Sequence, residues 1–403
     1  MSSKTKRNSI KFNNSDYVIN SCKPLALCVG LWPINYKHSQ IRKIISIILN
    51  IIAILLILQR FLFTVIFSTF VLKSITLRIA ISAPACYHIC NLIKYIVILF
   101  RIEKIEKCLK IMKEDWRYIE NNEQHEVMIN NAKTGRYIIF ICTSIIFLSG
   151  LGYNILAPLL SHSIVTHRNI TVKPFPSPVY GKFFTSGQSP IYEIIFAVQL
   201  VTAFFLYSVT AVAISYIAIL TMHACSQFDI VMIYLNKLID IQDKEKTVHK
   251  KFVIIVNTHH RVVSFVAKLE DAFTEICFID MALCSIGLCL LGYVIILFAK
   301  QSNYVTAMSF VIHFTSLLFN IFIYCYIGEM LLHKATKVRE TCCTISWHLL
   351  PHETSKNFIF FLQSTQTSTH ITAGKVITLS FTTFSSVIRS AGAYCNALWN
   401  MNK

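Results

Sequence analysis

Histidines at short spacing are the first residues to examine for chemistry, because pairs of imidazoles hold catalytic metals. His348 and His352 are four residues apart, but Pro351 between them interrupts the helix that would bring both rings to one face. His259 and His260 are adjacent, so a helix directs their rings away from each other. Both pairs therefore fit surface or interhelical positions better than a metal site.

Motifs of common catalytic and phosphate-binding sites are also missing from the sequence. It contains no HExxH, CxxC or GxSxG and no Gly-rich phosphate loop. The adjacent thiols Cys342 and Cys343 fit either palmitoylation near the inner leaflet of a membrane or a buried structural pair. We expect neither a cofactor nor a metal ion, and we do not expect an enzyme.

Charged residues inside long apolar segments are the other candidates, because a charge within a bilayer is costly and often functional. Arg60, Lys94 and Arg389 lie inside such segments. Asp280 and Glu275 flank the start of another. A proton-coupled transporter would keep acidic residues deep in the bilayer, whereas the deep residues here are few and basic. Snorkelling, or contact with cytoplasmic helices, is the interpretation that explains most of them.

These candidates must be positioned by membrane-spanning helices, since the composition is wrong for a soluble globule. Hydrophobic residues make up 54% of the chain and charged residues only 14%, whereas soluble domains carry about 25% charged residues. Gly and Pro are scarce, which favours long helices over a β-barrel. The net charge of +18 lies in loops between apolar runs, so it indicates contact with membrane lipid rather than nucleic acid.

Seven segments are long and apolar enough to cross a bilayer, which takes about 20 residues in a helix. Six are clear: Ile44–Phe67, Ile75–Phe100, Tyr137–Leu160, Ile191–Met222, Ile276–Ala299 and Tyr304–Tyr326. The seventh, Ile371–Trp399, is rich in Ser and Thr, but its length and its lack of acidic residues favour a span. The sequence thus predicts an all-α bundle of seven transmembrane helices.

The Lys and Arg residues predict how this bundle is oriented. The amino-terminal segment and the second, fourth and sixth loops hold 28 of them, and the opposite side holds seven. By the positive-inside rule the amino end is cytoplasmic, and Lys403 lies outside. The glycosylation sequon at Asn169 falls on the predicted outer side, and none of the 14 cysteines lies in the predicted outer loops.

Apolar stripes at helical spacing follow two of the spans into the cytoplasmic loops. Leu109, Met112, Trp116 and Ile119 form one stripe, and the second comprises Val253, Val256, His260, Val263 and Val266. We therefore expect the helices to continue beyond the membrane and to pack on one another there.

The last eighty residues carry four short motifs in a specific order. These are Cys325-Tyr326-Ile327-Gly328-Glu329, Trp347 followed by Leu350-Pro351, Ile371-Thr372-Ala373-Gly374-Lys375, and the helix Phe384–Tyr394. Their order and spacing resemble the insect odorant receptor family. Ala393 is one departure, because family members commonly carry Ser or Thr before the Tyr.

The resemblance implies an odorant receptor in the plasma membrane of sensory neurons. Such a receptor is the odorant-binding subunit of a ligand-gated, non-selective cation channel, in which four subunits that include a shared co-receptor surround one pore. The chain then divides into a cytoplasmic segment (1–43), six spans with helical loops (44–326), a cytoplasmic segment with an anchor helix (327–370), and a pore-lining seventh span with a short extracellular end (371–403).

The seventh span is the predicted pore helix. Small and hydroxyl-bearing residues recur there on one face, and by position the resemblance adds a gate and a polar contact beside it. The pore and gate candidates are Ser386, Ser390, Ala393, Ala397, Asn400 and Met401, with Ala397 and Met401 at the gate. The alternative is that this face packs on the fifth or sixth span, because small residues also favour close helix packing.

A volatile ligand needs an apolar pocket with few polar groups. The resemblance implies a site within the outer half of the bundle, among spans two to six. Depth and chemistry nominate Tyr87, Tyr153, Phe204, Phe205, Phe310 and His313, although each could instead face lipid or fill space between helices.

Two other receptor classes are open alternatives. A gustatory receptor channel is similarly oriented, but its last span usually carries Thr-Tyr and a terminal Gln-Phe, where Asn400-Met401 stands here. A G-protein-coupled receptor would have its amino end outside, and the sequence lacks its Asp-Arg-Tyr and Asn-Pro-x-x-Tyr motifs.

Overall fold

The computed structural model describes residues 16–33, 40–119, 121–156, 158, 164–165, 171–172, 175–177, 190–239, 245–302, 304–366 and 369–401. In this part of the chain, six helices are long and apolar enough to cross a membrane. They are α3 (Gln40–Phe70), α4 (Ile75–Arg117), α5 (Asn122–Leu151), α7 (Ile191–Asn236), α8 (Glu245–Lys300) and α9 (Tyr304–Thr344).

The remaining elements are short, apart from the last helix. They are α2 (Lys23–Cys28), the π-helix η1 (Gly152–Leu156), the 3-10 turn η2 (Trp347–Leu349), α10 (His352–Thr365), α11 (Phe381–Met401), and the antiparallel pairs β1 (Ile164–Val165) with β2 (Thr171–Val172) and β3 (Thr372–Ala373) with β4 (Ile377–Thr378). The predicted helical bundle is confirmed, and five of the six clear spans each fall within one long helix. The third covers part of α5 and η1, and its predicted end at Leu160 lies outside the described residues.

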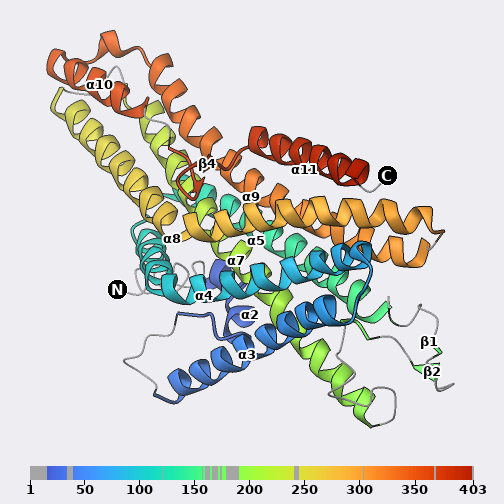
Figure 1. Ribbon diagram of the computed structural model, residues 1–403. Coiled ribbons are helices and arrows are strands. Elements are labelled where there is room, and N and C mark those ends of the chain that lie inside the picture. Colours follow the sequence, from blue (N-terminus) through green and yellow to red (C-terminus); the bar gives the residue numbers. More distant parts are fainter. Residues whose placement is uncertain are drawn as a thin grey trace.

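The helices extend well beyond the thickness of a bilayer. The 56 residues of α8 amount to about 84 Å at 1.5 Å per residue, against a hydrocarbon core of roughly 30 Å. In Figure 1 the bundle is elongated, with α10 and the start of α8 at one end and the β1–β2 pair at the other. The predicted continuation of the spans is therefore confirmed.

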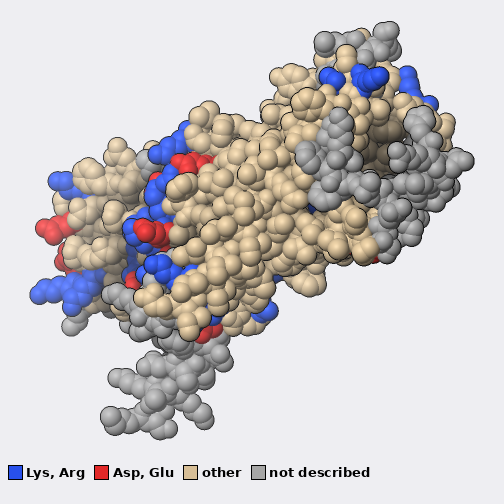
Figure 2. Space-filling view, turned by 60° about the horizontal axis from the view of Figure 1, so that its bottom comes forward, with Lys and Arg blue, Asp and Glu red and all other residues tan. Residues whose placement is uncertain are grey.

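Charged side chains gather at the α10 end. Figure 2 shows a wide belt with few charged residues next to a region dense in Lys, Arg, Asp and Glu. Ion pairs join the helices there: Arg101 with Glu275, Lys104 with Asp271, Lys237 with Glu123, and Lys334 with Asp229. An uncharged belt beyond such a region is what a membrane-embedded bundle requires.

Helix α7 forms the centre of the bundle, and α3 covers it from outside. Nearly every residue of α7 from Phe205 to Ser226 is buried, as expected for a helix that is apolar on all faces. Helix α3 buries only Ala53, Ile57, Arg60 and Thr64, which recur at helical spacing along one stripe. Much of the rest of α3 is exposed or half-buried apolar surface, suited to contact with lipid.

The amino-terminal segment 16–33 inserts its last part into the bundle, whereas Tyr17 and Leu27 before it are exposed. Val29 and Leu31 are fully buried, and their carbonyl oxygens accept hydrogen bonds from the hydroxyls of Tyr95 (2.8 Å) and Tyr216 (2.9 Å). Gly30 between them has a φ of +71°, which glycine adopts without strain. Tyr95 belongs to α4 and Tyr216 to α7, so the segment connects two helices that follow it in the chain.

The predicted start of the seventh span at Ile371 is wrong, because the helix begins ten residues later. The preceding residues form the β3–β4 hairpin, which turns at Gly374 (φ +64°) and Lys375 (φ +59°). Both backbone amides of this turn donate to Thr274 of α8, at 2.9 and 3.0 Å. Ile371 and Leu379 are buried against the protein, so their apolar character reflects packing rather than contact with lipid.

Candidate functional site

Four of the six predicted ligand residues converge on one aromatic cluster. His313 of α9 lies at its centre, with ring centroids 5.1 Å from Tyr87 of α4 and 5.4 Å from Tyr153 of η1. Phe310 is 6.5 Å from Tyr153, and Tyr207 of α7 adds a ring 5.9 Å from Tyr87. Because α4 and α9 begin at the β1–β2 end, the cluster lies in the half of the bundle near that end.

The other two predicted ligand residues lie apart from this cluster. Phe204 is 40% exposed and packs on Phe147, at 6.0 Å between ring centroids. Phe205 is buried and its ring contacts Phe204. Among the described residues, no ring contact connects either phenylalanine to His313. Adjacent residues of a helix point about 100° apart, so the two rings cannot both face one pocket.

A π-helix and a glycine shape the wall of the cluster. The wider turn of η1 presents both Tyr153 and Asn154 toward the interior, and π-bulges are frequent at functional sites. The amide nitrogen of Asn154 donates to the Tyr207 hydroxyl (2.9 Å) and to the Gly150 carbonyl (2.9 Å). A Cβ atom at Gly150 would overlap the ring of Tyr207, so only glycine allows this approach.

Arg60 is buried in the same region, and the interpretation that it snorkels to the membrane surface is wrong. It is 6% exposed, and its Nη2 donates to Oδ1 of Asn154 at 2.7 Å. Its Nη1 donates to the Gln199 carbonyl at 2.9 Å. Snorkelling requires a path to water, and packing of α3 on α7 closes that path.

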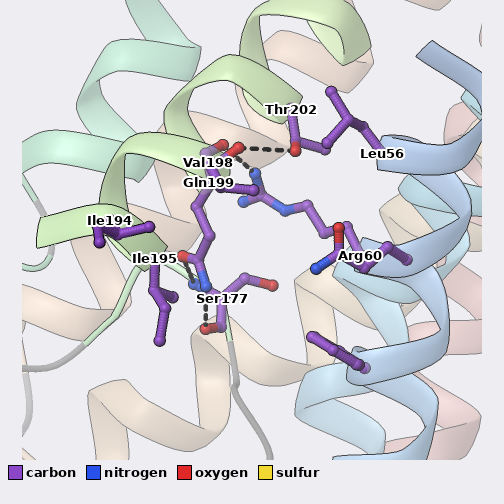
Figure 3. Close-up of a pocket in the computed structure, with 10 residues that line it drawn as sticks. Leu56, Arg60, Ser177, Ile194, Ile195, Val198, Gln199 and Thr202 are labelled. Carbon is purple, nitrogen blue, oxygen red and sulfur yellow. Dashed lines mark hydrogen bonds between the residues drawn. The ribbon is translucent and has the colours of Figure 1, made fainter. Parts of the chain in front are cut away.

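A cavity of about 180 Å³ lies beside Arg60, between α3 and α7 (Figure 3). It is lined by Leu56, Gln59, Arg60, Phe63, Ser177, Ile194, Ile195, Val198, Gln199 and Thr202. The side-chain amide of Gln199 pairs with both backbone groups of Ser177, each at 3.1 Å, which holds this wall together. Cavities of about 150 Å³ bind benzene, so the space fits a small organic group.

Lys94 and Asp280 form a buried ion pair between α4 and α8, which sequence reasoning missed. The two charged atoms are 2.5 Å apart, and each side chain is 1% exposed. Lys94 also donates to the Thr210 hydroxyl at 3.3 Å, and Thr210 donates to the side chain of Asn91 at 2.7 Å. The interpretation of Lys94 as snorkelling is therefore also wrong. Opposite charges within separate apolar segments were the signal that could have revealed the pair.

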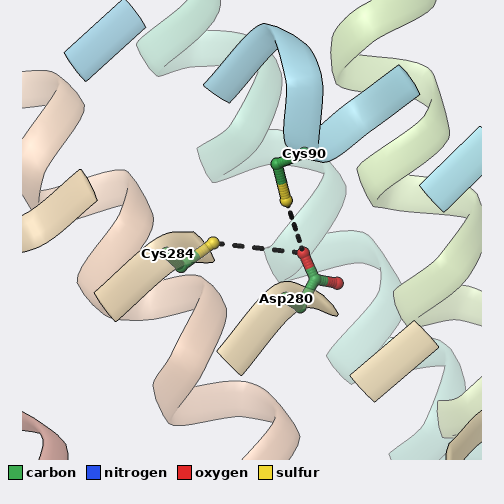
Figure 4. A group of neighbouring side chains, drawn as sticks. All are labelled: Cys90, Asp280 and Cys284. Atoms are coloured by element: carbon green, nitrogen blue, oxygen red, sulfur yellow. Dashed lines mark hydrogen bonds between the residues drawn. The ribbon is translucent and has the colours of Figure 1, made fainter. Parts of the chain in front are cut away.

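Cys90, Asp280 and Cys284 form a group that has the chemistry of metal ligands (Figure 4). The two thiols lie 3.8 and 4.0 Å from one carboxylate oxygen of Asp280. That oxygen is the one that pairs with Lys94, so an ammonium group already occupies the position a cation would need. We therefore interpret the group as part of a polar connection between α4 and α8 rather than as a metal site.

The predicted pore face of α11 is largely exposed. Ser386, Ser390 and Ala397 line a groove of about 560 Å³ between α11 and α8, and Ala393 and Asn400 are exposed. Met401 ends the helix, and its side chain lies outside the described part of the structure, as does Asn169. The opposite side of α11 packs on the bundle. Near its end Lys300 of α8 lies 4.1 Å from the ring centroid of Trp399.

Comparison with known protein families gives one match over most of the chain. A family model described as "7tm Odorant receptor" matches residues 77–392. Odorant receptor 13a of Drosophila melanogaster is 20% identical over 320 residues, which cover 72% of this chain and 74% of that protein. Odorant receptor 10 of Aedes albopictus is 23% identical over 240 residues, or 54% of this chain and 59% of that protein.

Solved structures give a match over the whole bundle. The olfactory receptor OR5 from Machilis hrabei, in complex with eugenol, superposes with a TM-score of 0.76 and 14% sequence identity. The match covers 96% of this chain and 100% of that one. A second structure of the same receptor gives a TM-score of 0.73. At this identity the comparison establishes a shared fold.

Proposed function

This chain belongs to the odorant receptor family, whose model covers residues 77–392, and from that membership we propose a specific function. The chain is the odorant-binding subunit of a ligand-gated, non-selective cation channel. The family consists of membrane receptors rather than enzymes. The proposed channel contains a co-receptor subunit and lies in the plasma membrane of sensory neurons, with the amino end in the cytoplasm.

The aromatic cluster around His313 is the observation that carries the ligand part of the proposal. Rings from four structural elements meet there, and such a site offers dispersion and edge contacts to a small apolar molecule. The buried polar atoms beside it provide a few directed hydrogen bonds for specificity. The complex of the Machilis hrabei receptor with eugenol supports a small organic ligand for this fold.

A pore along α11 is supported by the exposure of its small and hydroxyl-bearing face. An isolated helix with so many uncovered Ser and Ala residues would contact lipid poorly, whereas around a central axis the same face would line a water-filled path. In this proposal Ala397 and Met401 form the gate, and Asn400 lies beside it. Contact of Trp399 with Lys300 would then transmit movements of α8 to the gate.

A chain of contacts runs from the ligand cluster toward α11. Tyr87, Asn91 and Lys94 follow one another on one face of α4, and the Asn91 amide donates to the Tyr87 carbonyl at 3.0 Å. Lys94 then pairs with Asp280 of α8, the helix that forms the groove with α11. We propose that ligand contact at Tyr87 shifts α4 against α8 and so opens the pore.

The test is expression in cells with and without the co-receptor, with cation current recorded against a panel of neutral volatile compounds. His313→Ala is expected to raise the half-maximal ligand concentration at least about 10-fold, because it removes the central ring of the cluster. The matched control is Phe204→Ala, on the exposed face of α7, which is expected to leave the response unchanged. Absence of current with every subunit combination, while the protein is at the cell surface, would contradict the channel proposal.

A further inference from the structure

The half of the molecule that holds the ligand cluster is almost without acidic side chains. No Asp or Glu occurs in residues 17–102, 127–192 or 281–328, which supply most of that half. The acid nearest in sequence to the cavity is Glu193, which is exposed at the start of α7. Glu193 is adjacent in sequence to the lining residue Ile194, but neither it nor any other described carboxylate forms an ion pair with the arginine buried in this region.

Arg60 is that arginine. Its two hydrogen-bond acceptors, the Asn154 side chain and the Gln199 carbonyl, are neutral. Its Nε atom is buried and has no partner among the described residues, and no salt bridge to Arg60 occurs there. A buried charge is stable when it is paired and hydrogen-bonded, and it is costly otherwise. The guanidinium thus lacks an anion.

Two histidines near Arg60 have unused hydrogen-bonding atoms as well. His88 and His313 are 3% and 5% exposed, and the charge of Arg60 acts on both rings. The Nδ1 atom of each ring has no partner within the described residues. The Arg60 Nε–H is thus a buried donor without an acceptor, whereas each imidazole Nδ1 can donate or accept according to its tautomer.

The cavity beside Arg60 has the shape of a site for an amphiphile. Its polar groups, on Arg60, Gln199 and Thr202, lie together, as Figure 3 shows. Leu56 and other apolar side chains form the remaining walls. Ile194, at the rim, is 61% exposed on the outer surface of α7, so the cavity opens toward the side where lipid would lie.

We propose that this cavity binds a carboxylate, with the guanidinium of Arg60 as its counter-ion and the apolar tail of the acid between α3 and α7. A guanidinium and a carboxylate form paired, parallel hydrogen bonds, and the unused Nε–H is one of the donors that such a pair employs. The ligand class is a straight-chain carboxylic acid, either a free volatile acid or a fatty acid of the membrane. The assignment rests on the proposed receptor function and adds the chemical class of the ligand.

Binding of radiolabelled decanoic acid to the purified full-length receptor at pH 7.5, where the acid is ionised, tests the proposal. We expect decan-1-ol and methyl decanoate to compete at least about 10-fold less well than unlabelled decanoic acid. Arg60→Met is expected to weaken binding of the acid about 10- to 100-fold, and Arg60→Lys to weaken it less. Equal competition by acid and alcohol would overturn the assignment.

A second pair of variants keeps the test valid if Arg60→Met does not fold. Val198→Trp places a large side chain in the cavity and is expected to abolish binding of the acid. The control Val201→Trp lies on the same helix at 49% exposure and does not line the cavity, so binding should persist. Unchanged binding in Val198→Trp would equally refute the site.

Two further readouts separate the source of the acid from the receptor function. Fatty acid that copurifies with the receptor and is lost in Arg60→Met would identify a membrane source, and current evoked by hexanoic acid would identify a volatile one. Acid binding without any current would leave the site intact and contradict the channel. Currents evoked by neutral odorants without any acid binding would support the channel and contradict the acid site.

Discussion

At the scale of single residues, the buried pair of Lys94 and Asp280 is the interaction most sensitive to change. Each side chain is 1% exposed, so neither charge is solvated by water. Removing one partner of a buried pair leaves the other uncompensated, whereas exposed pairs contribute little. The pair therefore holds α4 and α8 at a fixed register even if its net contribution to stability is small.

Lys94→Met is expected to lower the free energy of unfolding by about 3–5 kcal/mol, because Asp280 would remain as an unpaired buried charge. Thermal or denaturant unfolding of the purified receptor in detergent measures the change. Lys104→Met is the matched control, since the pair of Lys104 with Asp271 is 37% and 53% exposed and should contribute below about 1 kcal/mol. Equal losses in the two variants would contradict the argument.

Chemistry and depth along the sequence were enough to nominate Tyr87, Tyr153, Phe310 and His313, which the structure brings together. They were not enough for Arg60 and Lys94, because snorkelling or contact with cytoplasmic helices was sufficient to explain basic residues inside the spans. The two outcomes differ because the sequence does not show which face of an apolar helix is directed toward its neighbours. A helix that is apolar on every side has no periodic signal, so the sequence does not reveal which of its residues face another helix.

At the scale of elements, α8 shows how an apolar run can be assigned to the wrong face. The buried row in its first half is Phe252, Ile255, His259, Val262 and Val266, whereas Val253 is 42% exposed and His260 is exposed. The predicted stripe is therefore displaced by one position over most of its length. Because Phe252 and Val253 are both apolar, the sequence allows either of two helix faces to be the buried one. The ring of Phe252 packs on Phe358 and Phe361 of α10, and this contact places the Phe252 face inside.

His259 connects α8 to α10 outside the predicted membrane-spanning residues. Its ring packs edge-on against Phe361, with 5.2 Å between centroids, and 6.5 Å from Phe228. Burial, and to a smaller extent the neighbouring His260, lowers the pKa of His259 to about 4. The folded protein therefore favours the neutral imidazole, whereas the unfolded chain takes up a proton near pH 6.5.

The contribution of His259 to stability is present above pH 6.5 and is lost as the pH falls toward 4, because the unfolded chain binds the additional proton in that window. We expect a slope of up to about 1.4 kcal/mol per pH unit from this residue. His259→Phe should flatten that part of a stability profile measured by denaturant unfolding between pH 7 and 4. His260→Asn, at the exposed neighbour, should retain the slope, and a steeper loss in His259→Phe would refute the assignment.

At the scale of the whole molecule, the distribution of charge predicts how the receptor is inserted. The α10 end holds most of the acidic and basic side chains, and the neighbouring belt holds few. By the positive-inside rule, the uneven Lys and Arg count predicts that the α10 end lies in the cytoplasm. The bundle, its six long apolar helices and their extensions were predictable from hydropathy, but the β3–β4 hairpin was not, since its burial depends on contacts with α8.

An epitope tag at the amino end is expected to bind antibody only after the cells are permeabilised. A tag after Lys403 is expected to be accessible on intact cells, because an odd number of spans separates the two ends. Immunofluorescence with and without detergent measures both. The reverse pattern would overturn the proposed orientation, and with it the assignment of the α10 end to the cytoplasm.

The buried amino-terminal segment has a consequence for the order in which the receptor is assembled. The Leu31 carbonyl bonds to Tyr216, 185 residues further along the chain. At about 5–20 residues per second, the ribosome needs roughly 10 to 40 s to make that stretch, so the segment leaves it long before its partner exists. Helices α3 and α4 are therefore made before Leu31 can reach Tyr216, although Val29 can already bond to Tyr95 of α4. Complete docking of the segment thus waits for α7 and marks a bundle built through that helix.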